Sequence, residues 1–306
     1  MSVTTTKREE SHRLRVQADA ISATLPPLLV AAKRIAASVT LGVHGRRRAG
    51  SGDSFWQFRP YTKDDTPGQI DWRQSAKFDT VFVKDREVVS AQTAILWCDT
   101  SPSMRYRSSP KLPTKAERAA VMMLTMAELI TDAGERILRV SGDARSQRGG
   151  TGRLAVAQIA DALAAELMAE PREGTPEVPS FPSTLPRHAT ILMFSDFLAP
   201  FEETAASIRA LARQGLKGHL MQVLDPAEET LPFTGRVRFV GLENEGATVI
   251  DRAEEARAGY IKKLTAHREA LKALAITAGW SFGLHHTDHS PQPALAALHN
   301  AVTGYR

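Results

Sequence analysis

The stretch from Thr93 to Met104 constrains the fold most strongly, because an unbroken apolar run ends there in an acid. A short apolar run of this kind predicts a strand that is buried on both faces. Asp99 then lies at the carboxyl end of the strand, where open α/β sheets bind their ligands. Pro102 and its small neighbours favour a tight loop, so the side-chain oxygens of Asp99, Ser101 and Ser103 are expected near one point.

Two interpretations of this loop are open. An acid followed by serines after a strand often forms only a turn and a helix N-cap. The same oxygens also suit a hard divalent cation such as Mg2+. Two later segments favour the metal interpretation: Gly149–Gly152, which precedes a segment of helical periodicity, and Ile191–Asp196, which is a second apolar run ending in an acid.

Segments of helical and strand periodicity alternate along the chain. Helices are predicted at Pro27–Ser38, Lys115–Ala133, Leu154–Ala169, Phe201–Gln214, Arg252–Ala278 and Pro293–Val302, and strands at Ile137–Val140, His188–Asp196, Leu216–Leu224 and Trp280–His286. The alternation predicts an α/β fold with a mostly parallel, Rossmann-like sheet that carries helices on both faces. We assign this fold to residues 91–306. Residues 1–90 are expected to form a helical/β N-terminal extension, whose polar residues 1–17 are disordered.

The composition limits the cellular setting. With 306 residues, 42% of them hydrophobic, the chain can bury a full core. The single cysteine, Cys98, excludes an internal disulfide, which fits a reducing compartment. No stretch approaches the roughly 20 apolar residues that cross a bilayer, and Met1–Arg15 is too polar for a signal peptide. We therefore expect a soluble cytoplasmic protein, whose net charge of +5 permits acidic partners without demanding them.

A second informative region runs from Gly45 to Ser90 and mixes basic, acidic and aromatic residues. Basic residues beside aromatics, as in Gly45–Tyr61, are typical of nucleic-acid binding surfaces. Between Arg46 and Glu87, however, six Arg and three Lys accompany six Asp and one Glu, a net charge of +2. Such alternation of sign is more typical of salt bridges and turns than of a phosphate-binding track.

The motifs of these regions follow one another in a specific order. Gly50 and Gly52 precede Phe55, Arg59 and Tyr61, then Asp65, the block Ile70-Asp71-Trp72-Arg73 and Ser75-Ala76, and finally Asp99, Ser101, Ser103 and Met104. In this order the chain resembles the bacterial domain-of-unknown-function family fifty-eight, from about residue 28 to at least residue 196. Lys63-Asp64 stands where such proteins typically have Gly-Asp, so the turn there departs from the family pattern.

Members of that family resemble a von Willebrand factor A domain with an extra N-terminal region. The resemblance implies a metal-ion-dependent adhesion site, which uses an Asp-x-Ser-x-Ser loop, a threonine loop and an aspartate loop. Asp99, Ser101 and Ser103 match the first loop, Thr151 is assigned to the second and Asp196 to the third. The implied cofactor is Mg2+, or Mn2+ or Ca2+, with one coordination position left for a carboxylate of a partner protein.

The resemblance also implies a partner, because such proteins are usually encoded beside a MoxR-type AAA+ ATPase. The expected function is a non-enzymatic adaptor for this ATPase in protein assembly or maturation. The charged residues considered either for partner binding or for internal ion pairs are Arg59, Asp65, Asp71 and Arg73. The two apolar residues of the Ile-Asp-Trp-Arg block, Ile70 and Trp72, are expected to be core anchors.

Two other function classes stay open. A metal-assisted hydrolase or phosphotransferase would use Asp99 as its nucleophile, but Ser101 stands where a haloacid-dehalogenase-like loop needs a second Asp. The chain also lacks Gly-x-x-x-x-Gly-Lys, His-Glu-x-x-His and Gly-x-Ser-x-Gly motifs. Nucleic-acid binding through Gly45–Tyr61 is the second alternative. His285, His286 and His289 have no Cys or Glu at a fixed metal-ligand spacing, which is more typical of solvated histidines.

Overall fold

The computed structural model describes residues 30–39, 56–61, 70, 72–77, 81–86, 93–141, 147–169, 181, 185–186, 189–242 and 246–304. Its internal contacts divide the chain into two units. The larger unit comprises Met1–Val43 together with Gln92–Arg306, and the smaller unit comprises His44–Ala91. Within the described residues, no helix is both long enough and apolar enough to cross a bilayer.

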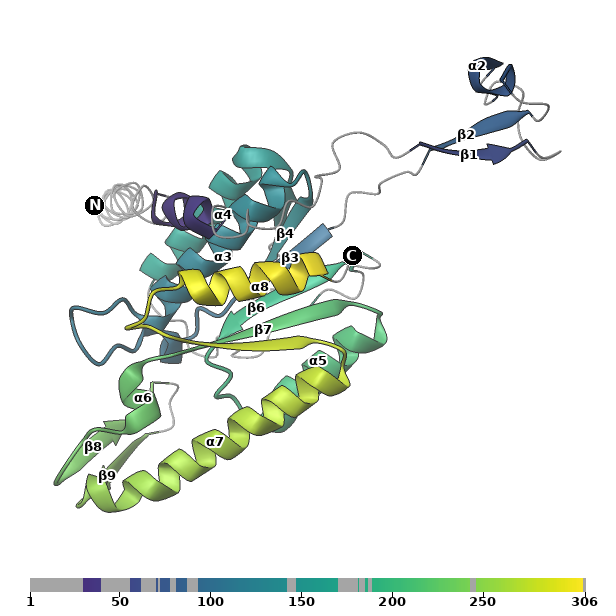
Figure 1. Cartoon of the computed structure of the whole chain (residues 1–306). Helices are drawn as coiled ribbons and strands as arrows, with labels where there is room; N and C mark the ends of the chain where they lie inside the picture. Colours follow the sequence, from purple (N-terminus) through teal and green to yellow (C-terminus); the bar gives the residue numbers. More distant parts are fainter. Residues whose placement is uncertain are drawn as a thin grey trace, which may run out of the picture. The chain divides into compact units, whose positions relative to one another are not determined.

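Six strands form the main sheet of the larger unit, in the order β10-β7-β6-β3-β4-β5 (Figure 1). Their bounds are β3 Thr93–Cys98, β4 Arg136–Val140, β5 Gln147–Gly150, β6 Thr190–Ser195, β7 Lys217–Leu224 and β10 Ser281–His286. All neighbouring strands are parallel except β4 and β5, which are antiparallel. The prediction of an α/β, Rossmann-like fold with a mostly parallel sheet is therefore confirmed.

The central strands bury both of their faces. Leu96 and Phe194 belong to one cluster of buried apolar side chains, and Ile95 and Trp97 belong to another. Because side chains alternate along a strand, these two clusters lie on opposite faces of the sheet. Burial on both faces explains why the strand sequences are unbroken apolar runs rather than alternating ones.

Helices cover both faces of this sheet. The cluster of Leu96 includes buried residues of α3 (Lys115–Asp132), α4 (Gly152–Met168) and α8 (Gln292–Gly304). The cluster of Ile95 includes residues of α5 (Phe201–Arg213) and α7 (Ala253–Thr277). The result is the three-layer arrangement visible in Figure 1, in which the sheet is the middle layer.

A helix at residues 30–39 packs onto the same face as α3. Ala32, Ile35 and Val39 belong to the cluster of Leu96. The Thr125 hydroxyl donates to the Ala32 carbonyl at 3.4 Å. The helix, which the sequence analysis placed in the N-terminal region 1–90, is thus part of the core of the larger unit.

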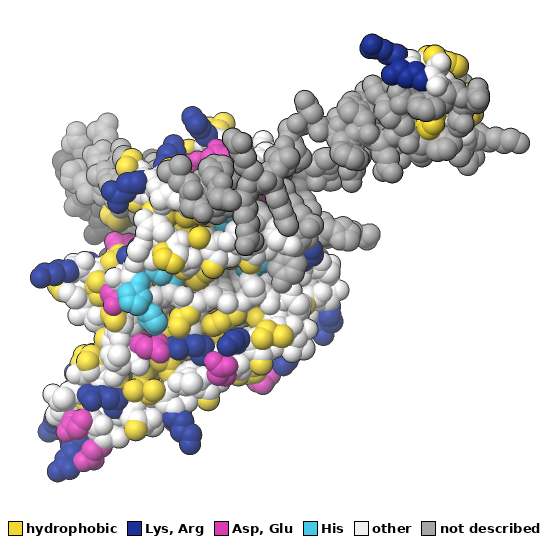
Figure 2. All heavy atoms as spheres, in the orientation of Figure 1, with side chains coloured by type: hydrophobic (Ala, Val, Ile, Leu, Met, Phe, Trp, Pro, Cys, Tyr) yellow, Lys and Arg dark blue, Asp and Glu magenta, His cyan; other side chains and the backbone are white. Residues whose placement is uncertain are grey.

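Two smaller features complete the larger unit. Helix α6 (Pro226–Thr230) follows β7 directly, and β8 (Val237–Val240) pairs with β9 (Ala247–Ile250) as an antiparallel hairpin. Neither α6 nor this hairpin is among the elements named in the sequence analysis above. Charged side chains of both signs lie among hydrophobic ones over α7 and this hairpin (Figure 2).

The smaller unit contains β1 (Trp56–Pro60), β2 (Phe82–Arg86) and α2 (Trp72–Ser75). Strands β1 and β2 are antiparallel partners, and the Ser75 hydroxyl accepts a hydrogen bond from the Phe82 amide at 2.9 Å. The expectation that Trp72 anchors a core is wrong, because 67% of this residue is exposed. Helix α2 has only four residues, which is too short to form an apolar face that packs against a core. The aromatic character of Trp72 alone therefore did not predict its burial.

Candidate functional site

Two acids meet at the carboxyl edge of the main sheet. Asp99 follows β3 and Asp196 follows β6, and these two strands are parallel neighbours. Their register pairs Cys98 with Phe194, and the Asp99 amide continues the ladder by donating to the Phe194 carbonyl at 2.9 Å. Because parallel strands end at the same edge, both carboxyl groups are brought to one place.

The Asp99 carboxylate is buried and held on both oxygens. Its Oδ1 accepts from the Ser101 amide at 2.8 Å, and its Oδ2 accepts from the Ser195 hydroxyl at 2.6 Å. Only 2% of Asp99 is exposed. Burial and then the nearby charge of Asp196 raise the pKa of Asp99 to about 7, against the lowering effect of these hydrogen bonds. Ionisation of Asp99 beside the Asp196 carboxylate is therefore unfavourable unless a cation compensates the charge.

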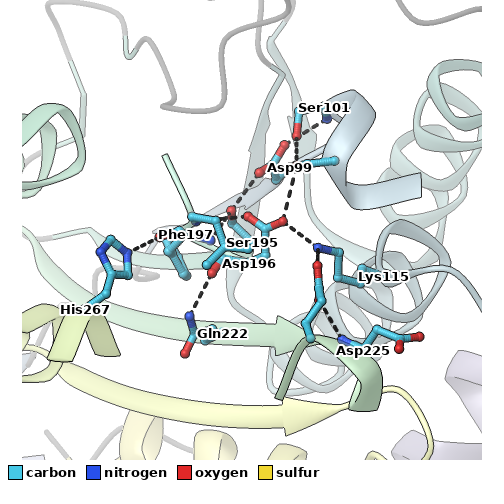
Figure 3. A network of polar contacts seen from close by, with 12 residues as sticks. Asp99, Ser101, Lys115, Ser195, Asp196, Phe197, Gln222, Asp225 and His267 are labelled. Atoms are coloured by element: carbon cyan, nitrogen blue, oxygen red, sulfur yellow. Dashed lines mark hydrogen bonds and ion pairs between the residues drawn. The ribbon is translucent and has the colours of Figure 1, made fainter. Parts of the chain in front are cut away.

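Two serine hydroxyls connect the loops that follow the strands. The Ser101 and Ser103 hydroxyl oxygens lie 3.1 Å apart. The Ser103 hydroxyl donates to Asp196 Oδ2 at 3.2 Å. Ser103 lies in the short 3-10 helix η2 (Pro102–Arg105), so this helix turns the hydroxyl back toward the sheet edge. Asp99, Ser101, Ser103 and Asp196 are thus one hydrogen-bonded cluster (Figure 3).

The turn after β6 fixes the orientation of Asp196. Its Oδ1 accepts from the Leu198 amide at 3.1 Å, and its carbonyl accepts from Gln222 Nε2 at 2.8 Å. Phe197 adopts a left-handed backbone with φ 51°, which is strained for a bulky residue. The contact of its carbonyl with His267 Nε2 of α7, at 2.6 Å, holds this conformation.

Lys115 supplies the only cationic side chain that contacts the cluster within the described residues. Its Nζ donates to Asp196 Oδ2 at 2.7 Å and to Glu228 Oε1 at 2.5 Å (Figure 3). Only 1% of Lys115 is exposed. Burial alone would lower the pKa of Lys115, but the ion pairs with Asp196 and then Glu228 raise it. The ammonium group therefore stays charged inside the protein.

Helix α6 presents Glu228 to this lysine. Asp225 caps α6 and accepts from the Ala227 amide at 2.9 Å, while Glu228 Oε2 accepts from the Asp225 amide at 2.9 Å. The second oxygen of Asp225 accepts from the Ser108 amide, also at 2.9 Å. This capping box fixes the Glu228 side chain, and burial raises the pKa of Glu228.

The remaining predicted residues lie elsewhere or outside the described residues. Thr151 is the exposed N-cap residue of α4, and no hydrogen bond joins it to the four clustered side chains, all of which the structure describes. Arg73 is exposed in α2, and Arg59 lies in β1. Asp65 and Asp71 lie outside the described residues.

The donors of the cluster fit a hard divalent cation by their chemistry. Carboxylate and hydroxyl oxygens are ligands that Mg2+ prefers. Among the residues that the structure describes, no group of three or more His, Cys, Asp and Glu is placed to hold a metal. An ion at this edge therefore depends on Ser101 and Ser103 as well as on Asp99 and Asp196, and Asp196 is also the partner of the Lys115 ammonium.

Sequence comparison places the chain in a family. Residues 57–270 match the family described as "Protein of unknown function DUF58", which is well over half of the chain. The chain belongs to the DUF58 family. The resemblance drawn from the order of motifs is thereby confirmed. Asp99, Ser101, Ser103, Lys115 and Asp196 all lie inside the part of the chain that matches the DUF58 family. No curated protein matches this chain.

Two of the solved structures with similarity to this chain come from Bacteroides species. The conserved hypothetical protein BatB from Bacteroides thetaiotaomicron is 15% identical with a TM-score of 0.40, over 69% of this chain and 99% of that one. An aerotolerance-related membrane protein from Bacteroides fragilis NCTC 9343 is also 15% identical with a TM-score of 0.39, over 70% and 99%. The family assignment rests on the sequence match alone.

Sequence reasoning missed three residues of the site: Lys115, Ser195 and Glu228. One signal was present for Lys115, which is the first residue of α3 after the N-cap Thr114. A cation at this position is repelled by the positive end of the helix dipole. A buried acidic partner is therefore needed to hold the lysine there. The partner itself could not be named, because Glu228 is distant in sequence and lies in a helix too short to show a periodicity.

Proposed function

We propose that this chain is a non-enzymatic protein-interaction module of the von Willebrand factor A type, which binds its partner through a divalent cation. The cation would be Mg2+, or Mn2+ or Ca2+, at the edge where β3 and β6 end. The observation that supports this proposal most directly is the single hydrogen-bonded cluster of Asp99, Ser101, Ser103 and Asp196. Two loops 93 residues apart in the chain meet there through the contact of Ser103 with Asp196.

The residues of the cluster have distinct tasks in this proposal. Ser101 and Ser103 offer neutral hydroxyl ligands, while Asp99 and Asp196 provide the negative charge that attracts a cation. A cation held by few protein charges would supply Lewis acidity for a carboxylate of the partner. The Ser195 hydroxyl and the Leu198 amide hold the two carboxylates in place before any ion binds.

The proposed partner is a MoxR-type AAA+ ATPase. Membership of the DUF58 family supports this proposal, because the family resemblance implies such an ATPase as the genomic neighbour. The chain would act as an adaptor in protein assembly or maturation, and it would work in the cytoplasm. Arg59, Asp65, Asp71 and Arg73 stay candidates for contacts with the ATPase.

The two alternatives have less support. A hydrolase or phosphotransferase would need Asp99 as an accessible nucleophile, yet Asp99 is buried and both of its oxygens accept hydrogen bonds. Nucleic-acid binding rests on Gly45–Tyr61, of which the structure describes only residues 56–61. On the larger unit, the face shown in Figure 2 mixes both signs of charge over α7 rather than forming a basic track.

A direct test is a Mn2+ titration followed by electron paramagnetic resonance, with Mg2+ as the competitor. Wild type should bind one Mn2+ per chain, and Mg2+ should displace it. Asp99→Ala should weaken binding by roughly 10- to 100-fold, the usual effect of losing a group that orients or charges a metal site. Asp161→Ala, which removes an exposed acid of α4, is the matched control and should bind like wild type. Equal Mn2+ affinity in wild type and Asp99→Ala would contradict the proposed site.

A further inference from the structure

The Lys115 ammonium group lies where a positive charge is needed at the proposed metal site. It contacts Asp196 Oδ2 at 2.7 Å and Glu228 Oε1 at 2.5 Å, from the first residue of α3. We propose that Lys115 is a built-in cation of this site, which neutralises Asp196 in the metal-free state and gives way when a divalent cation binds. The inference rests on the proposed function, because it concerns how the same site is regulated.

The position of Lys115 carries an energetic cost that ordinary packing does not explain. A lysine ammonium is strongly hydrated, so its near-complete burial is unfavourable unless acids pair with it. The first turn of α3 adds repulsion from the helix dipole. Among the described residues, Asp196 and Glu228 are the acids that pair with the ammonium and offset these penalties, and the Tyr106 ring lies 6.0 Å from Nζ. The lysine is thus held there by the charge of the site.

Lys115 and a divalent cation would compete for the same oxygen. Asp196 Oδ2 accepts from both Lys115 and Ser103, while Asp196 Oδ1 accepts from the Leu198 amide. A new cation at Oδ2 must replace one of these donors. Of the two donors at Oδ2, only Lys115 carries a positive charge, so repulsion between the cations selects Lys115 as the group that gives way.

Glu228 gives the released lysine a second place to bind. Because Glu228 is already in contact with Nζ, Lys115 can leave Asp196 without becoming an unpaired buried charge. Glu228 also belongs to the capping box of α6, through the Asp225 amide. The occupancy of the metal site is therefore connected to α6 through side chains that are already in hydrogen-bonding contact (Figure 3).

The decisive variant is Lys115→Met, which removes the charge and keeps most of the apolar stem. A like charge within contact distance commonly disfavours a charged state by one or more powers of ten, so this variant should bind Mn2+ about tenfold more tightly than wild type or better. The matched control is Arg268→Met, which loses an ion pair with the neighbouring Glu229 of α6. The control should bind Mn2+ like wild type.

The outcomes separate this inference from the proposed function. Tighter Mn2+ binding by Lys115→Met than by a wild type that itself binds Mn2+ supports the inference. Binding by Lys115→Met beside none by wild type overturns both the inference and the proposed function, because Lys115 then does not give way to the ion. Equal or weaker binding by Lys115→Met, beside measurable binding by wild type, overturns the inference and leaves the proposed function intact. Absence of binding in both proteins overturns both.

A second measurement follows Lys115 in the wild-type protein itself and does not use Lys115→Met. In metal-free wild type, the buried Lys115 ammonium should give a protected 1H–15N signal, which Lys115→Arg removes and thereby assigns. Addition of Mg2+ should shift or broaden this signal as the contact with Asp196 is lost. Mg2+ binding that leaves the Lys115 signal unchanged would overturn the inference.

Discussion

Asp99 and Asp196 show how one sheet edge can hold two buried acids at different energetic cost. Asp196 has an ion pair with Lys115, whereas the donors to Asp99 among the described residues, the Ser101 amide and the Ser195 hydroxyl, are neutral. Burial and the charge of Asp196 accordingly raise the pKa of Asp99 to about 7. The sequence predicted that these two acids come together, because both end apolar strands, but the sequence distance from Lys115 to Asp196 concealed the ion pair.

A second buried residue makes a separate prediction about acid stability. His285 is 4% exposed, and its Nε2 has no hydrogen-bond partner among the residues that the structure describes. Burial lowers the pKa of His285 to about 4, with smaller contributions from Arg118, His286 and His289, and Asp288 acts in the opposite direction. Between the ordinary pKa of 6.5 and about 4, the unfolded chain binds a proton that the folded chain does not.

The free energy of unfolding should therefore fall as the pH falls through this window. His285→Gln cannot titrate, so its stability should decline less steeply between pH 6.5 and pH 4 than that of wild type. Urea unfolding at several pH values measures both slopes. Equal slopes for the two proteins would mean that His285 does not contribute to the pH dependence of the free energy of unfolding.

At the scale of helices and strands, periodicity predicted the long elements well and the short ones poorly. Helix α7 (Ala253–Thr277) and strand β7 (Lys217–Leu224) lie within a residue of their predicted bounds. Helix α6 has five residues, which is too few to show a period, although Asp225 and Glu228 carry the capping-box pattern. Trp72 was misassigned to the core for the same reason, since α2 has only four residues.

Strand β7 also makes a packing prediction. A Cβ added to Gly218 would lie 2.0 Å from a ring carbon of Trp280, whose Nε1 donates to the Leu216 carbonyl at 3.0 Å. Gly218→Ala should therefore destabilise the protein by roughly 3 kcal/mol, because the indole cannot move without losing this hydrogen bond.

The matched control is Gly259→Ala in the exposed part of α7, where a Cβ meets nothing within 4 Å. This change should stabilise the protein by about 0.5–1 kcal/mol through helix propensity. Urea unfolding of both variants gives the comparison. Equal stability of Gly218→Ala and wild type would show that the strand and Trp280 are less tightly packed than described.

At the scale of the whole molecule, the larger unit is built from two stretches of chain that are separated in the sequence by the smaller unit. The helix at residues 30–39 contributes to the larger unit, while residues 44–91 form a separate unit before β3 begins. Sequence patterns gave the strand and helix alternation of the larger unit, but they gave no information on long-range packing of Ala32, Ile35 and Val39 against α3. Such packing depends on shape in three dimensions, which periodicity does not encode.

This packing predicts that the N-terminal helix is needed for stability. Ile35 is 6% exposed and lies in the main core, so Ile35→Ala should destabilise the larger unit by about 2–4 kcal/mol. Val30→Ala, on the same helix but 64% exposed, should change stability by no more than about 0.5 kcal/mol. Thermal unfolding distinguishes the two variants, and similar melting temperatures would place the helix outside the core.

The most direct test of the account is binding of a purified MoxR-type AAA+ ATPase from the same organism, measured by calorimetry. Mg2+ and nucleotide stay present throughout, since a chelator would also disable the ATPase. We predict that wild type and the control Asp161→Ala bind the ATPase, and that Asp99→Ala binds it at least about tenfold more weakly. Equal binding by Asp99→Ala and wild type would contradict a metal-dependent interaction at this edge.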